Sequence, residues 1–252
     1  MELRTSDDVR LEARQWLTEV ERRGTVVLVH GFAAGMAEAR VVALAGALQG
    51  AGFDVLAYDS RGHRASEGEA TLGDHERLDV EAAVGAVRGP GPIVLVGASM
   101  GAIAALRYVA AAPGTVAGVV SVSCPGRWRL PRNARGVLSA LLTQTAVGRN
   151  FARRRIGVRI APRGPRATPP VELVTTLGVP LAIVHGRCDP FIGTADAELL
   201  YGAAPEPRRL ELVEGLGHAF EAPATGPVLA AVEWCLGQAG TPRPPVREAG
   251  AA

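Results

Sequence analysis

One serine lies where its hydroxyl could act as a nucleophile. Gly97-Ala98-Ser99-Met100-Gly101 reads GxSxG, and it follows the apolar run PIVLVG and precedes the helix-like run MGAIAALRYVA. Small flanking residues allow a sharp strand-to-helix turn, which would lift the Ser99 hydroxyl clear of the sheet at the start of a helix. Free N–H groups there stabilise developing negative charge. An incidental serine in a glycine-rich turn is the alternative, but this position between strand and helix favours a nucleophile.

A serine hydroxyl needs a base, and the base needs an orienting acid. Of the five histidines, His218 is best placed, in a tight turn after RRLELV and before the last helix-like stretch. Asp189 follows the run PLAIVH by four residues. The other position for an acid, after the run VAGVVSV, holds Ser123-Cys124-Pro125 and no carboxylate. The alternatives are a surface loop histidine and an aspartate that only caps a turn.

Attack on a carbonyl carbon would create an oxyanion, which needs N–H donors already in place. Met100 follows the nucleophile and supplies one backbone N–H. The loop after TVVLVH reads His30-Gly31-Phe32 and offers the N–H of Phe32. We interpret His30, and His185 in a second HG pair, as structural residues whose rings brace their loops.

The elements that must position these residues alternate between short apolar runs and longer amphipathic stretches, as in a mostly parallel sheet with helices on both faces. A weak signal for an opening hairpin covers Leu3–Arg4 and Val9–Trp16. The predicted strands are 25–30, 53–58, 92–97, 116–122, 180–185 and 208–213. The predicted helices are about 36–49, 74–88, 100–111, 134–147, 194–203 and 224–236.

This alternation breaks once, and the break predicts a short cap or lid over about residues 125–170. The segment holds eleven arginines and no Asp or Glu, in a chain whose 27 basic residues are all arginine. Three hypotheses remain for it: attraction of an anionic substrate, with Arg153, Arg154 and Arg155 as binding residues; docking to an acidic partner or anionic membrane; and a solvated face.

Composition limits the remaining possibilities. A net charge of +2 over 252 residues gives no argument for nucleic acid, and no run reaches the ~20 apolar residues of a membrane span. Three scattered cysteines and a charged N-terminus predict free thiols and a cytoplasmic location. No phosphate loop or metal-ligand cluster is present, so we expect no metal and no cofactor. We expect one domain over 1–237 and a disordered tail over 238–252.

Together these pieces resemble the α/β-hydrolase superfamily, over about residues 5–237, and most closely its small bacterial serine esterases, lysophospholipases and thioesterases. The resemblance rests on HGF (30–32), YDSRGH with Ser66, GASMG (97–101), HGRCDP (185–190) and GLGHAF (215–220). The order Ser, Asp, His is the one this fold uses. Arg64 stands where such loops commonly have glycine, which makes the local conformation an open question.

The resemblance implies a hydrolase that cleaves a small-molecule ester or thioester, with an anionic substrate as one option. The reaction would pass through an acyl-enzyme on Ser99, with Asp189 and His218 completing the triad. Two alternatives stay open. An acyltransferase, or an enzyme that eliminates an acyl group in secondary metabolism, would use the same residues. A ligand-binding homologue without turnover would keep the fold alone. The substrate and the oligomeric state cannot be read from the sequence.

Overall fold

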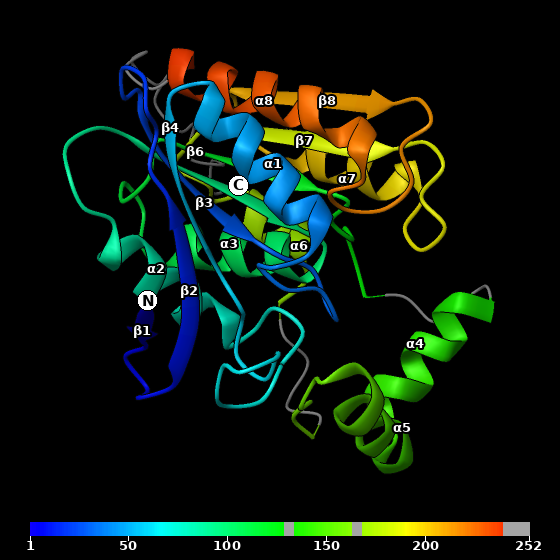
Figure 1. Cartoon of the computed structure of the whole chain (residues 1–252). Helices are drawn as coiled ribbons and strands as arrows, with labels where there is room; N and C mark the ends of the chain where they lie inside the picture. The colour runs from blue at the N-terminus through cyan, green and yellow to red at the C-terminus, as the bar shows by residue number, and fades with distance from the viewer. Residues whose placement is uncertain (129–133, 163–167, 239–252) are drawn as a thin grey trace, which may run out of the picture.

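The computed structural model describes residues 1–128, 134–162 and 168–238. Its centre is an eight-stranded sheet in the order β1-β2-β4-β3-β5-β6-β7-β8, in which β3 to β8 run parallel and β1 and β2 pair antiparallel (Figure 1). The strands are β1 Glu2–Arg4, β2 Arg10–Trp16, β3 Gly24–Val29, β4 Phe53–Tyr58, β5 Ile93–Ala98, β6 Gly118–Val122, β7 Leu181–Gly186 and β8 Arg208–Val213. The predicted α/β-hydrolase fold class and the opening hairpin are both confirmed.

Helices cover both faces of the sheet because alternate strand residues point to opposite sides. Val27 and Val29 of β3 belong to one buried cluster, and Val26 and Leu28 belong to the other. The first cluster packs against α2 (Glu76–Ala86), α3 (Met100–Ala111), α6 (Pro170–Val174) and α7 (Thr194–Ala203). The second packs against α1 (Ala39–Gly50) and α8 (Thr225–Gln238).

The segment predicted as a cap contains more structure than expected. The helix predicted over 134–147 is wrong as one element, because the Thr145 side chain accepts a hydrogen bond from the N–H of Gly148 and starts a second helix. The segment therefore holds α4 (Ala134–Gln144), α5 (Ala146–Phe151) and a π-helical turn η1 (Ala152–Ile156), and it ends where α6 begins. Figure 1 shows α4 and α5 outside the layers formed by the sheet and its covering helices.

Beyond η1, the chain pairs with the loop that follows β4. His63 and Val158 form an antiparallel bridge, and Ala70 and Ile160 form a parallel one. A third small apolar cluster forms at this contact, and it includes part of the HGF loop: Phe32, Ala33, Ala70, Ala152, Ile156, Val158 and Ile160. This end of the insertion is thus fixed to the body beside the candidate oxyanion loop.

The predicted tail over 238–252 lies, except for Gln238, outside the described residues. The single domain over 1–237, the cap function of 125–170 and the cytoplasmic location stay predictions. Among the described helices, none is long and apolar enough to cross a bilayer.

Candidate active site

Ser99 lies on the strained turn that the GxSxG pattern predicts. It connects β5 to α3 with a φ of +51° and a ψ of −112°, a conformation that costs a non-glycine residue about 1–3 kcal/mol. A side chain at Gly101 would collide with the backbone of Val29 and His30, so only glycine fits there. The packing around the turn holds the Ser99 side chain, which is half-buried, at the carboxyl edge of the sheet.

Asp189 and His218 form a close pair although 29 positions separate them. The Asp189 Oδ2 lies 2.7 Å from the His218 Nδ1. The Asp189 side chain is 1% exposed and that of His218 is 21% exposed. The other carboxylate oxygen accepts the backbone N–H groups of Phe191 and Ile192 at 2.8 and 3.0 Å.

These contacts fix the charge on the acid. Burial alone would raise the pKa of Asp189, but the hydrogen bond to His218 and the two backbone N–H groups outweigh it, and the pKa falls below its usual value. An ionised carboxylate on Nδ1 orients the imidazole so that Nε2 is the basic nitrogen. The pair therefore has the geometry of a general base with its supporting acid.

Close backbone packing holds the loop that carries His218. Leu216 and Gly217 pass directly over Gly186, and the Cys188 N–H donates to the Leu216 carbonyl at 3.0 Å. A Cβ at Gly186 would collide with both passing carbonyls. The loop that presents the acid and the loop that presents the base are thus joined by backbone as well as by side chains.

The end of β6 joins the nucleophile turn to the base loop. The Ser99 N–H donates to the Val122 carbonyl at 2.9 Å, and the next residue, Ser123, accepts the Ala219 N–H on its Oγ at 3.1 Å. This contact of Ser123 was not predicted. A hydroxyl that accepts a backbone N–H 96 positions away leaves no local pattern in the sequence.

The structure brings Asp189 and His218 together, and the end of β6 contacts both Ser99 and the residue that follows His218. Among the described residues, the Ser99 hydroxyl makes no hydrogen bond, to His218 or to any other group. A free hydroxyl in the resting state is common in such sites, because catalytic hydrogen bonds often tighten only when substrate is bound.

The two predicted oxyanion donors both lie near Ser99. Met100 begins α3 immediately after Ser99. Gly31, the residue before Phe32, lies against Ser99, since a Cβ built on Gly31 would be 3.5 Å from the Ser99 Cβ. Within the described ranges, neither Met100 nor Phe32 donates its N–H to a protein acceptor. Their role as oxyanion donors stays a prediction.

Two buried histidines brace this loop, one predicted and one missed. His30 accepts the Ser60 N–H on Nε2 at 2.9 Å, and its Nδ1 lies 2.8 Å from the Gly31 carbonyl. His63 accepts the Ala33 N–H on Nε2 at 3.2 Å. Burial lowers the pKa of His30 to about 3 and also lowers that of His63, so both rings are neutral. The structural interpretation of His30 is confirmed.

His185 braces the acid loop as expected. Its ring is fully buried, and its Nε2 lies 3.0 Å from the Ile192 carbonyl. It also lies 3.9 Å from the Asp189 Oδ2. The ring therefore supports the turn whose N–H groups bind the Asp189 carboxylate.

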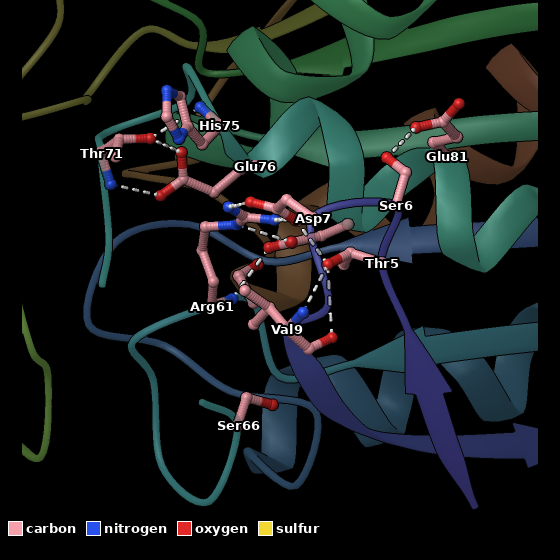
Figure 2. A network of polar contacts seen from close by, with 12 residues as sticks. Thr5, Ser6, Asp7, Val9, Arg61, Ser66, Thr71, His75, Glu76 and Glu81 are labelled. Carbon is pink, nitrogen blue, oxygen red and sulfur yellow. Dashed lines mark hydrogen bonds and ion pairs between the residues drawn. The ribbon is translucent and has the colours of Figure 1, made fainter. Parts of the chain in front are cut away.

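The YDSRGH motif supplies a buried ion-pair network. The Arg61 guanidinium bonds to Asp79 Oδ1 at 2.8 Å and to both oxygens of Asp7 at 2.8 and 3.0 Å. Figure 2 shows Arg61 beside Asp7 of the opening hairpin, with Glu76 and Thr71 in the same region. The guanidinium lowers the pKa of Asp7. The network ties the opening hairpin and α2 to the loop that carries His63.

Arg64 adopts a left-handed backbone conformation, although related loops commonly have glycine at this position. Arg64 has a φ of +49°, in the left-handed region that glycine would occupy without strain. Its N–H donates to the Gly157 carbonyl at 3.1 Å, and its guanidinium lies 3.4 Å from Glu38. Arg64 therefore bonds to Gly157 of the segment 125–170 while it holds a left-handed backbone conformation that a non-glycine residue disfavours.

Within the described residues, no hydrogen bond or ion pair joins the three predicted binding arginines to Ser99, Asp189 or His218. Arg153, Arg154 and Arg155 lie on η1 and are exposed. Arg153 bonds to the Asn150 side chain, and none of the three forms an ion pair within the described part of the chain. Within the same ranges, no three His, Cys, Asp or Glu side chains converge as a metal-ligand set.

Comparison with known proteins agrees with the class that this architecture defines, the α/β-hydrolases. The profile of the family described as serine aminopeptidase, S33, matches residues 20–162. The chain belongs to this family, and the resemblance seen in the sequence is confirmed.

Solved structures give the same fold at low sequence identity. An esterase from Pyrococcus furiosus, Pf2001, superposes with a TM-score of 0.71 at 22% identity, covering 94% of this chain and 90% of the esterase. The esterase RhEst1 from Rhodococcus sp. ECU1013 has a TM-score of 0.66 at 21% identity, covering 95% and 99%. XC6422 from Xanthomonas campestris, described as an α/β serine hydrolase without a lid, has a TM-score of 0.64 at 18% identity, covering 97% and 95%.

A curated relative gives no functional description. The protein YqkD of Bacillus subtilis (strain 168), described as uncharacterized, is 28% identical over 181 residues. The match covers 67% of this chain and 57% of YqkD, so this chain spans little more than half the length of that relative.

Proposed function

We propose that this chain is a serine hydrolase that cleaves a small-molecule ester or thioester through an acyl-enzyme on Ser99. One observation carries the proposal: a strained serine at the start of a helix is linked through one strand end to a buried Asp–His pair. Ester hydrolysis is also the activity named for two of the structural neighbours.

The chemistry follows from the arrangement. The His218 Nε2 removes the proton from the Ser99 hydroxyl as the oxygen attacks the carbonyl carbon. The ionised Asp189 stabilises the imidazolium that forms and holds its Nδ1–H. The imidazolium then protonates the leaving alcohol or thiol. In the second half, His218 removes a proton from water, which attacks the acyl-enzyme. The imidazolium then returns this proton to the Ser99 oxygen as the ester bond breaks and the acid leaves.

The oxyanion formed in each half would lie between the N–H groups of Phe32 and Met100. Removing one such donor in other enzymes lowers kcat by about 10²–10³. The neutral His30 and His63 rings keep the first donor loop in position. Because both donors are backbone groups, neither can be removed by a simple substitution.

Residues 125–170 form the cap in this proposal, and their arginines favour an anionic substrate. The exposed guanidinium groups of Arg153, Arg154 and Arg155 lack acidic partners within the described chain, and η1 packs into the cluster that includes Phe32. A carboxylated ester should therefore lose kcat/KM as salt is added or as these arginines are replaced by alanine, relative to a neutral ester. An equal response of the two esters would refute this part.

The nucleophile is tested with a fluorophosphonate probe and an ester and thioester chain-length series. Ser99→Ala should abolish labelling and lower kcat by at least 10⁴, because the acyl-enzyme can no longer form. Ser6→Ala, at an exposed serine far along the chain, is the matched control and should label as wild type does. Labelling of Ser99→Ala at full stoichiometry would refute the assignment.

Two further outcomes decide between the alternatives. Product analysis with added alcohols, amines and thiols identifies an acceptor other than water, and an aminoacyl arylamide in the same panel tests the aminopeptidase activity named for the family. Tight ligand binding without turnover of any ester, thioester or amide would support a ligand-binding homologue instead.

A further inference from the structure

The segment 125–170 is an insertion between β6 and β7, and its helices expose large apolar side chains that nothing in the described chain covers. We call the surface of α4, α5 and η1 the insertion surface. Leu138 and Leu141 are three residues apart on α4, and Val147 and Phe151 are four apart on α5, so each pair shares a helix face. Their exposed fractions are 57%, 53%, 82% and 51%. Exposed apolar groups gathered on one small unit indicate a binding surface.

The same surface carries cations without counter-ions. Arg153, Arg154 and Arg155 are exposed and have no acidic partner within the described chain, and residues 125–170 contain no Asp or Glu. Several arginines of the body are paired with acids: Arg22 pairs with Asp54 at 2.6 Å, and Arg61 is doubly paired. The insertion surface therefore combines protruding apolar groups with unneutralised positive charge.

We propose that the insertion surface binds an anionic lipid surface. Its aliphatic and Phe side chains would enter the boundary between head groups and acyl chains, and its arginines would bind the phosphates, as interfacial amphipathic helices do. A second copy of the chain fits less well, since a symmetric contact would bring like charges together. An acidic protein supplies the charge but has less use for Val147, which protrudes at 82% exposure rather than lining a recess.

The insertion surface lies next to the candidate oxyanion loop, so docking on a lipid surface would affect the candidate active site. The turn η1 continues directly from α5, and its Ala152 and Ile156 pack into the cluster that contains Phe32. A chain docked through α5 would therefore hold the candidate oxyanion loop close to the lipid boundary. Substrates dissolved in that boundary would be concentrated there.

The test measures sedimentation of the full chain with vesicles of phosphatidylglycerol or of phosphatidylcholine. We expect binding to phosphatidylglycerol that weakens with salt, and little binding to phosphatidylcholine. Neutralising three arginines (Arg153, Arg154 and Arg155, each to Gln) should weaken binding by about a hundredfold, since each basic side chain near an anionic membrane contributes about a factor of five. The control neutralises three exposed arginines elsewhere, Arg14, Arg40 and Arg77, and should change binding by less than tenfold.

A second variant separates lipid from other partners. Val147→Glu with Phe151→Glu should reduce vesicle binding at least tenfold, whereas Leu17→Glu, at an equally exposed leucine on the body, should not. Absence of binding to phosphatidylglycerol, or equal binding by all variants, would overturn the proposal. So would tight binding to soluble polyglutamate that ignores Val147 and Phe151, or a dimer in solution that these substitutions dissolve. Circular dichroism of each variant verifies that it is folded.

Discussion

Replacing the Ser123 hydroxyl tests whether the end of β6 positions the catalytic base. In the structure, the Ser123 Oγ accepts the N–H of Ala219, the residue after His218, at 3.1 Å. Ser123 is fully buried, so Ser123→Ala would leave this N–H without a protein acceptor. The Asp189–His218 bond and the backbone contacts at Gly186 would remain.

The size of the effect follows from that one bond. A buried donor left unsatisfied costs about 1–3 kcal/mol, and the lower half of this range applies because Ala219 is only partly buried. If the cost acts on the conformer that holds His218 in place, kcat falls about 5- to 30-fold while KM stays within twofold. If it acts on the whole fold, Tm falls by about 2–4 °C for each kcal/mol and kcat is unchanged.

We expect the first result, measured as kcat and KM for one ester together with the rate of fluorophosphonate labelling and a thermal melt. Ser121→Ala is the matched control, since Ser121 lies on β6 just before Ser123 and is equally buried, and among the described residues its hydroxyl makes no hydrogen bond to the loop that carries His218. Equal kcat in Ser123→Ala and Ser121→Ala would refute a positioning role. Loss of all activity in Ser99→Ala with normal activity in Ser123→Ala would leave the proposed mechanism intact and reject this link alone.

Three other measurements test the site and its supports. Asp189→Asn should lower kcat by about 10³–10⁴ without unfolding the chain, because a neutral amide cannot replace the ionised carboxylate that the lowered pKa of Asp189 maintains beside His218. Asp79→Ala should reduce the free energy of unfolding in urea by about 3–5 kcal/mol, because it leaves the buried Arg61 charge with one partner fewer; retention of wild-type stability would contradict the network. As the pH is lowered from 6.5 to 3, the unfolding free energy should also fall by up to about 1.4 kcal/mol per pH unit on account of His30. In this range the His30 ring takes up a proton in the unfolded state but stays neutral in the folded state. His30→Asn should flatten this dependence.

Local patterns in the sequence predicted most of the sheet and the candidate triad. The strand 53–58 and the helices 100–111 and 194–203 have the predicted limits, because each is a continuous apolar or amphipathic run with clear breaks. The pairing of Asp189 with His218 could also be predicted, since each follows a parallel strand and the carboxyl ends of such strands meet at one edge.

Features that depend on distant contacts could not be predicted. Arg64 occupies a left-handed conformation that its residue type disfavours, and its N–H bonds to the carbonyl of Gly157, which becomes its neighbour only in the folded chain. The break at Thr145 is different, because its bond to Gly148 is local and threonine is a preferred N-cap residue. The prediction of one helix over 134–147 followed the helical periodicity and overlooked this cap.

Strained residues surround the candidate site, and this distribution supports a rigid arrangement of its parts. Among the described residues, non-glycine positions with positive φ include Ser99, the candidate nucleophile; Ser123, which directly follows β6; and Ala219, which follows His218, the candidate base. Ala33 in the oxyanion loop is a fourth. Each costs about 1–3 kcal/mol and persists only where surrounding contacts determine it. The carbonyl of Val122, the Ser123 hydroxyl and the ring of His63 provide such contacts. A loop free to relax would abandon these conformations, so the same contacts that hold the strain also hold the reacting groups in position.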